Sequence, residues 1–362
     1  MAFQTLARAG GHREDLFMDH VVAVFGAYGH TGRFVVAELR ARGFVPLLLG
    51  RDPGKLEALA ASHDYRVASV DDPASLDQAL KGAAAIINCA GPFAATAGPV
   101  IEAALRARIP YVDVAAEIEA NLDTFTHFAG RAETAIVPAM AFFGGLGDLL
   151  VTTAMGDWTA ADEAHIAYGL SSWHPTAGTL AAGTVSRDRR DGRRVRFTGG
   201  RLDYYAGERG LRTLEWDFPA PLGRRTVFDE FTMADVVTIP SHLPIPEVRT
   251  CMTTVAANDL GAPDTPAPVA VDERGRSAQT FTVDVVVRSG FTQRRITASG
   301  QDIYAISAPL AVEAIHRILT GRTRTTGVAS AGEIFDAPDF LRALSAHLSL
   351  GPRAESRLPE FA

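Results

Sequence analysis

Near its start the chain carries the stretch Val21-Val-Ala-Val-Phe-Gly-Ala-Tyr-Gly-His-Thr-Gly-Arg33, in which an apolar, β-branched run leads directly into a glycine-rich turn. The run predicts a strand over residues 21–25, and the amphipathic residues 33–42 predict a helix after the turn. Such a turn points free backbone N–H groups and the positive end of a helix dipole at one place, which suits a diphosphate. We therefore expect a dinucleotide to bind at the start of the first helix.

The glycines of this turn, Gly26, Gly29 and Gly32, are spaced G-x-x-G-x-x-G instead of the standard G-x-G-x-x-G. Glycine permits a tight turn, close approach of backbone to phosphate and close packing of helix on strand. The alternative is a strand-turn-helix corner that binds nothing, but the flanking strand and helix are the context that the motif requires. We expect His30 to contact the cofactor through its backbone. Arg33 either adds positive charge beside the turn or is a solvated first-turn residue.

The end of the second predicted strand indicates which dinucleotide binds. Residues 45–49 are apolar and lead into Gly50, Arg51 and Asp52. At this position an acidic residue bonds the ribose 2′-OH of NAD, whereas an arginine accommodates the 2′-phosphate of NADP. Arg51 comes first, and its planar guanidinium matches a phosphate in a bidentate manner. The sequence thus favours NADP(H), while Asp52 is the competing residue that would favour NAD.

The alternation of apolar strands and helices continues beyond this point. Further strands are predicted over residues 65–70, 83–93 and 111–114, with helices over 74–80 and 99–108. This order predicts an α/β fold with a doubly wound, parallel (Rossmann) sheet. Ligands of such sheets bind beyond the carboxyl ends of the strands. The residues expected at those ends are Asp71, Asn88 to Phe93, and Asp113 to Glu117.

A second domain of α+β kind is predicted after Gly147. A helix over residues 149–156 precedes mostly strands, which predict a mixed, largely antiparallel sheet. Residues 236–239 read as one of these strands and residues 257–276 as a loop. The expected divisions are an N-terminal extension (1–17), the Rossmann domain (18–148), the second domain (149–302) and a C-terminal segment (303–350). We expect that last segment to pack back on the first domain and residues 351–362 to fray.

Composition narrows the class of protein. The chain has 362 residues and a net charge of −7, which argues against a nucleic-acid partner because a basic face is then expected. It has no run of about twenty apolar residues, so no membrane partner is expected. Its two cysteines, Cys89 and Cys251, lack metal-ligand spacing and fit a cytoplasmic location. A wide antiparallel sheet makes a homodimer plausible.

Several motifs together resemble the saccharopine dehydrogenase-like (saccharopine reductase-like) oxidoreductases. They are the glycine turn, Gly50-Arg51, Asn88-Cys-Ala-Gly-Pro-Phe93, Tyr111-Val-Asp-Val-Ala-Ala-Glu117, Ala298-Ser-Gly-Gln-Asp302 and Ala331-Gly-Glu333. The resemblance implies NADP binding and a second domain whose sheet covers the nicotinamide. Residues 159–272 match least, and substrate specificity in the family varies there. The implied cofactor-binding residues are Gly26, Tyr28, Gly29, His30, Thr31, Gly32, Arg33, Arg51, Asp71, Asn88, Ala90, Gly91 and Pro92.

The lysine content restricts the proton chemistry. Lys55 and Lys81 are the only lysines, so the second domain has no lysine acid or Schiff-base residue. Asp113 and Glu117 are candidate catalytic residues because they should face the nicotinamide end, although Asp113 could equally fix the loop. His174, beside Trp173 on a helix-entry loop, is a candidate proton donor because its unperturbed pKa lies near neutrality. The alternative for His174 is a surface or capping role.

These observations predict an NADPH-dependent reductase that transfers a hydride to a carbonyl, imine or activated alkene. The small-molecule substrate is expected to be small to medium in size and partly apolar, and no metal is expected. The alternative is a non-catalytic protein that senses NADP(H) or acts as a scaffold, which keeps the fold without turnover.

Overall fold

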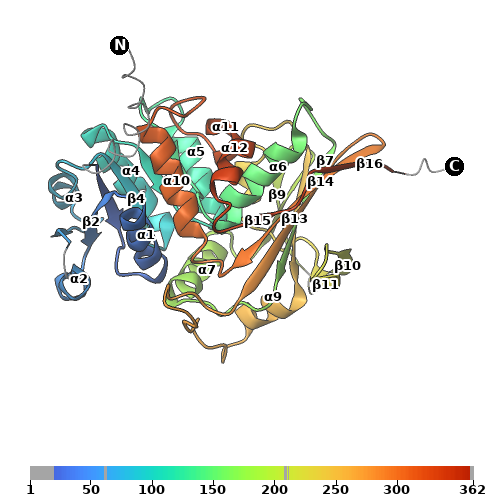
Figure 1. Ribbon diagram of the computed structural model, residues 1–362, viewed down its shortest axis with the longest axis horizontal. Coiled ribbons are helices and arrows are strands. Elements are labelled where there is room, and N and C mark those ends of the chain that lie inside the picture. Colours follow the sequence, from blue (N-terminus) through green and yellow to red (C-terminus); the bar gives the residue numbers. More distant parts are fainter. Residues whose placement is uncertain (1–19, 61–62, 208–209, 211, 359–362) are drawn as a thin grey trace, which may run out of the picture.

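Two β-sheets with their helices make up the described part of the chain (Figure 1), which comprises residues 20–60, 63–207, 210 and 212–358 of the computed structural model. The expected extension 1–17 and the last four residues lie outside the described residues. None of the described helices combines the length and apolar character needed to cross a membrane.

The first sheet confirms the predicted Rossmann fold. Its six strands are parallel and lie in the order β3-β2-β1-β4-β5-β6. That is the order of the classic dinucleotide-binding sheet, in which the order reverses between β1 and β4. The strands are β1 (Val21–Phe25), β2 (Val45–Gly50), β3 (Tyr65–Val67), β4 (Ala85–Asn88), β5 (Tyr111–Asp113) and β6 (Ile136–Val137). The helices are α1 (His30–Ala41), α2 (Pro53–Ala60), α3 (Pro73–Ala79), α4 (Phe93–Ala107) and α5 (Ile118–Phe128).

Several predicted boundaries in this sheet were wrong: the strand expected over residues 65–70 ends at Val67, and the helix expected from residue 33 starts at His30. Two others were wrong because side chains end one element and start the next. The strand expected over residues 83–93 stops at Asn88, whose Oδ1 accepts the Ala90 amide at 3.0 Å and turns the chain. Helix α4 starts at Phe93 instead of Pro99, which lies inside the helix. Glu117 makes this early start possible by accepting the first amides of α4.

The second sheet is mixed and largely antiparallel, as predicted. In the described residues it has ten strands, with β12 parallel to β7 and the other pairs antiparallel. The strands are β7 (Glu163–Leu170), β8 (Arg194–Thr198), β9 (Arg201–Tyr205), β10 (Thr213–Asp217), β11 (Arg224–Phe228), β12 (Glu247–Thr253), β13 (Thr280–Ser289), β14 (Thr292–Gln301), β15 (Ser349–Leu350) and β16 (Ala354–Arg357). The helical segments are η1 (Phe142–Leu146), α6 (Gly147–Met155), α7 (Ala177–Arg189), α8 (Asp235–Thr238) and α9 (Thr254–Gly261).

Three expectations for this half of the chain were wrong. Residues 236–239 form the short helix α8 instead of a strand, and its buried Asp235 accepts the Tyr168 hydroxyl at 2.8 Å. A four-residue apolar run does not distinguish a buried helical turn from a strand. The loop expected from residue 257 begins only after α9. Residues 354–357, expected to fray, form β16 along β14, where Glu355 and Arg294 lie 2.7 Å apart.

The C-terminal segment contacts elements of both sheets. Helix α10 (Ser307–Leu319) packs against α1, and α11 (Ala331–Ile334) and α12 (Ala337–Ala343) lie against α6. Val328 also forms a parallel bridge with Ile136 of β6. Figure 1 shows α10 between the helices of the first sheet and α6 of the second. One hydrophobic core therefore extends across both sheets.

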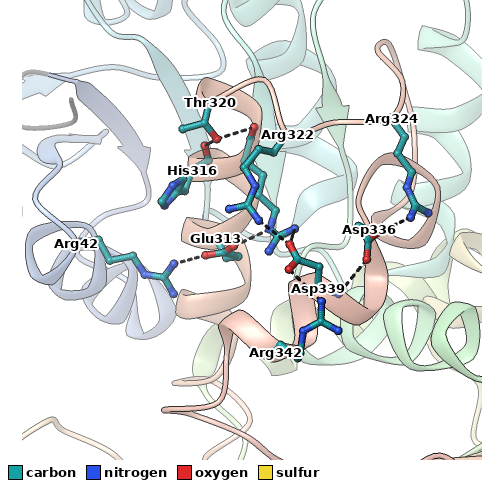
Figure 2. Close-up of polar contacts among 10 residues, drawn as sticks. Arg42, Glu313, His316, Thr320, Arg322, Arg324, Asp336, Asp339 and Arg342 are labelled. Carbon is teal, nitrogen blue, oxygen red and sulfur yellow. Dashed lines mark hydrogen bonds and ion pairs between the residues drawn. The ribbon is translucent and has the colours of Figure 1, made fainter. Parts of the chain in front are cut away.

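A network of ion pairs joins α10 to the end of α1 and to α12 (Figure 2). The Glu313 carboxylate lies 2.5 Å from Arg42, just after α1, and 2.6 Å from Arg317 one turn along α10. Arg317 then reaches Asp339 of α12 at 2.9 Å and lies over the Phe340 ring. Glu313 and Arg317 are only 5% and 1% exposed, so each charge depends on its partners for compensation.

A second polar cluster holds α11 against α6. The buried Asp148 accepts the Gly332 amide at 2.7 Å, and His242 Nε2 lies 2.7 Å from its other oxygen. Burial opposes a charge on His242, but Asp148, helped by Glu333, outweighs burial and raises the pKa of His242 above 6.5.

Arg317→Ala should lower the free energy of unfolding by about 3–5 kcal/mol, the range for breaking a buried ion pair, with the remaining Arg42 contact favouring the lower end. Urea unfolding measures this change. Arg342→Ala is the matched control, because Arg342 lies 3.2 Å from the same Asp339 but is 68% exposed. That variant should cost about 0–1 kcal/mol. Equal losses in the two variants would contradict a special role for the buried pair.

The His242 cluster predicts a pH dependence of stability. Because the folded-state pKa is raised, the contribution of His242 is fully present below pH 6.5 and is lost as pH rises through the folded pKa. His242→Asn should therefore cost about 1.5–3 kcal/mol at low pH, as expected for hydrogen bonds to charged groups. Its difference from the wild type should narrow as pH rises. Urea unfolding across this pH range tests the expectation, and a difference independent of pH would rule it out.

Candidate functional site

The glycine turn between β1 and α1 is packed too closely for any side chain. Gly26 has a positive φ of 83°, and a Cβ there would lie 2.9 Å from the backbone of Ala90, in the turn after β4. A Cβ at Gly32 would lie 2.2 Å from the Gly26 carbonyl oxygen. The two turns at the reversal point of the sheet thus touch through backbone. The space above them stays free of side chains from these positions.

The start of α1 is open to an anion. Its N-cap is Gly29, so no side chain caps the helix, and its first turn holds no acidic residue. The first amides of a helix have no partner within the helix itself. Arg33 in the first turn is exposed, and its Nε donates to the Tyr28 carbonyl at 3.2 Å. This uncapped, positively charged end fits the diphosphate of a dinucleotide.

The two candidate residues at the end of β2 differ in what they already bind. Asp52 accepts the Lys55 amide at 3.1 Å, and the Lys55 ammonium lies 3.5 Å away. The amide hydrogen bond lowers the pKa of Asp52 and engages it at the start of α2. Arg51 is exposed and has no ion-pair partner among the described residues. The geometry therefore favours Arg51 over Asp52 as the residue that meets the ribose.

Other predicted cofactor residues surround the same edge. The Tyr28 ring covers Gly50, where a Cβ would lie 2.5 Å from Tyr28 Cε1. Thr31 is half-buried in the first turn of α1. Asp71 is exposed after β3 and accepts the Ser69 hydroxyl at 3.4 Å. The structure thus brings residues from β1, β2 and β3 to one edge of the sheet.

Asn88 is buried and acts on the neighbouring turn. Its Nδ2 donates to Thr96 at 3.3 Å and to the Tyr111 hydroxyl at 3.2 Å, while its Oδ1 accepts the Ala90 amide. Thr96 in turn donates to the Ala90 carbonyl at 2.5 Å. The Asn88 amide is thus used within the protein. Its role in this geometry is to shape the turn of Ala90, Gly91 and Pro92.

The two candidate carboxylates at the end of β5 are also engaged by the protein. Asp113 is 1% exposed and accepts the amides of Ala115 and Ala139 and the Tyr111 hydroxyl, all within 3.0 Å. Burial raises the pKa of Asp113 to about 6, against these hydrogen bonds. Glu117 accepts the Phe93 and Ala94 amides at 2.8 and 3.1 Å. Burial raises the pKa of Glu117, and the amides lower it. These contacts fit the loop-fixing alternative better than direct chemistry.

His174 differs from the carboxylates. It lies half-buried in the loop between β7 and α7, and its side chain has no hydrogen-bond or ion-pair partner among the described residues. Its carbonyl accepts the Tyr304 hydroxyl at 3.4 Å, and the indole of the neighbouring Trp173 donates to the same hydroxyl at 3.0 Å. The Tyr304 ring packs edge-on against His30, with centroids 5.1 Å apart. The His174 loop is thus joined to the first turn of α1.

Sequence reasoning missed Tyr304. The motif ending at Asp302 stops two residues short of it, and no pattern predicted that its hydroxyl would reach a loop 130 residues earlier. His30 was expected to act through its backbone, but its buried Nε2 has no hydrogen-bond partner in the described structure. Burial lowers the pKa of His30, Asp302 raises it and Arg33 lowers it. The net effect is a lowered pKa, so the neutral form of the His30 side chain is favoured.

Comparison with known proteins gives the type of domain. Residues 22–138 match the family model of the saccharopine dehydrogenase NADP binding domain. Saccharopine dehydrogenase-like oxidoreductases of Homo sapiens and Mus musculus are 29% and 28% identical over alignments of 119 residues, and each alignment covers 27% of this chain. The matched region spans 28% of the length of each of these relatives.

A solved structure has a similar fold over most of the chain. The apo, histidine-tagged saccharopine dehydrogenase (L-Glu forming) from Saccharomyces cerevisiae superimposes with a TM-score of 0.63. The superposition covers 92% of this chain and 100% of the yeast chain at 12% identity. Residues 22–138 are therefore an NADP-binding domain of the saccharopine dehydrogenase type, within a chain that has the fold of a saccharopine dehydrogenase.

Proposed function

We propose that the protein is an NADPH-dependent reductase that transfers a hydride to a carbonyl, imine or activated alkene. The observation that carries the proposal is the uncapped start of α1 beside the exposed Arg51, in a domain that matches an NADP-binding model. Packing of the His174 loop onto that same start, through Tyr304 and His30, supports the proposal further. The proposal includes a cytoplasmic location and a homodimer, expected from the free cysteines and the wide antiparallel sheet.

In this proposal, residues of the first domain bind and position the cofactor. When bound, NADPH supplies the hydride. The first amides of α1 would hold the diphosphate, and Arg51 would hold the 2′-phosphate. Asn88 and Glu117 act indirectly, because they fix the turn of Ala90, Gly91 and Pro92 and the start of α4. Asp113 fixes the neighbouring loop through the Ala115 and Ala139 amides.

In this proposal, the second domain supplies an apolar wall beside the substrate and a proton donor. Trp173 is 4% exposed, and its ring lies 5.2 Å from that of Phe143. Such an apolar wall excludes water and suits a small to medium, partly apolar substrate. His174 is the proposed proton donor, since its side chain is uncommitted while Asp113 and Glu117 bind backbone amides.

A non-catalytic NADP(H) sensor or scaffold is the second candidate. The observation that favours it is that two of the three candidate acids, Asp113 and Glu117, already serve backbone amides. Both candidates predict NADPH binding. They differ in turnover, since a sensor needs no proton donor beside the nicotinamide.

Arg51→Ala should weaken NADPH binding by about 1.5–3 kcal/mol, the range for hydrogen bonds to a charged group, and leave NADH binding nearly unchanged. Calorimetric titration of both cofactors measures the two affinities. Arg40→Ala, an exposed arginine in the last turn of α1, is the control and should change neither affinity. Equal weakening of NADPH and NADH by Arg51→Ala would refute the assignment of Arg51.

His174→Ala should lower kcat on a reduced substrate by about 10²–10⁴-fold, the usual contribution of a general acid, while NADPH affinity is kept. NADPH oxidation on a panel of carbonyls, imines and enones provides the measurement. His127→Ala, an exposed histidine of α5, should retain full activity. If no compound is consumed and a partner protein co-purifies, the sensor or scaffold takes the place of the reductase.

A further inference from the structure

The Tyr304 hydroxyl joins four groups from one short stretch of the second domain. It accepts hydrogen bonds from the Trp173 indole at 3.0 Å and from the Thr176 amide at 3.3 Å. The Thr179 hydroxyl lies 2.9 Å away, and the His174 carbonyl lies 3.4 Å away. A phenol has one proton and two acceptor sites, so these contacts use its full capacity. Tyr304 is therefore the common partner of residues 173–179, which contain the His174 loop and the first turn of α7.

Tyr304 itself is held rigidly. The buried Asp302, with a positive φ of 62°, accepts the amides of Tyr304 and Ala305 at 2.9 and 3.1 Å. Its other oxygen accepts the Ser277 amide at 2.7 Å. Gln279 accepts the Ile303 amide and donates to the Ser172 carbonyl, which adds a second tie to the same loop. The position of the Tyr304 ring is thus set by backbone hydrogen bonds on its own side.

The Tyr304 ring also contacts the glycine turn between β1 and α1, through His30. His30, the first residue of α1, packs edge-on against Tyr304 at 5.1 Å and against Phe34 at 5.3 Å between centroids. Its Nε2 is buried and has no hydrogen-bond partner among the described residues. His30 also follows Gly29, the uncapped N-cap, directly. An anion bound at the start of α1 would therefore lie beside a ring that packs against Tyr304.

We propose that Tyr304 is a positioning residue that links the glycine turn between β1 and α1 to the His174 loop, so that a bound cofactor orders the loop before substrate enters. The inference rests on the proposed function, since it assumes that the cofactor binds at the start of α1. A bound diphosphate limits the motion of His30, because His30 is the first residue of the helix whose first amides would hold the diphosphate. The fixed His30 ring then supports Tyr304, and the Tyr304 hydroxyl holds residues 173–179. The second ligand to bind meets a loop that is already ordered, which is positive coupling between the two sites.

Hydrogen exchange with NADPH as the probe tests this link without any substrate. In the wild-type protein, saturating NADPH should slow exchange in two segments, residues 26–33 and residues 171–180. The second effect should be about fivefold, within the range for one hydrogen bond gained in a local opening. Tyr304→Phe keeps the ring and removes the hydroxyl. It should keep protection of 26–33, lose the NADPH effect on 171–180 and exchange faster there even without cofactor.

A variant of His30 tests the ring contact with Tyr304 separately from the Tyr304 hydroxyl, and a variant of Tyr205 serves as the control. His30→Ala should lose the NADPH effect on residues 171–180, while exchange there without cofactor stays at the wild-type rate. Tyr205→Phe is the matched control, because its hydroxyl bonds Glu230 at 2.6 Å in another part of the second domain. It should behave as the wild type does. If Tyr304→Phe fails to fold, Thr179→Val replaces it, since it removes one hydroxyl partner of Tyr304 and should reduce the same effect.

The outcomes distinguish the inference from the function on which it rests. If NADPH protects residues 26–33 but not 171–180 in the wild type, or protects both segments equally in Tyr304→Phe, the link is refuted and the cofactor site stands. If NADPH neither binds nor protects residues 26–33, the proposed function fails first.

Discussion

The whole molecule depends on a contact between two pieces of backbone. The turn after β1 and the turn after β4 approach so closely that a single methyl group at Gly26 would collide with Ala90. This approach occurs where the strand order of the sheet reverses, so the two turns leave an open edge with unsatisfied helical amides. Buried side chains maintain the second turn, above all Asn88 and Glu117. The site is therefore made of backbone, and the polar side chains around it act mainly as supports.

The rest of the chain is attached to the first domain at both ends of α1. On one side, at the C-terminal end of α1, the buried Glu313 and Arg317 of α10 pair with each other and also bind Arg42 and Asp339, so the network is complete only when α1, α10 and α12 are docked. On the other side, Tyr304 joins His30 to the His174 loop. The ion pairs of α10 provide stability. The Tyr304 contacts pass through residues that border the glycine turn, so they are the ones that could couple this turn to the His174 loop.

Local sequence signals predicted the parts of the structure that depend on local chemistry. The strand and turn at residues 21–32 and the arginine that directly follows β2 were readable from the residues. The start of α4 was not, because a carboxylate 24 residues away caps it. Asp113 and Glu117 were predicted to be catalytic because acids at the ends of parallel strands often are, yet both accept hydrogen bonds from backbone amides. Tyr304 left no local trace, since its partners lie about 130 residues earlier in the chain.

The first sheet and its helices are completed by the C-terminal segment, in which Val328 bridges Ile136 of β6, and this has a consequence for synthesis of the chain. The cofactor domain is not a continuous segment, because Arg42 finds Glu313 only across 271 residues of sequence. Contacts between residues so far apart in sequence slow folding, since the intervening chain must be ordered first. A nascent chain can form the first five strands early on the ribosome, yet it must wait for α10 to be released before α1 has its partner. During that interval the part of α1 that packs against α10 is exposed, and this is the stage at which a chaperone would meet the protein.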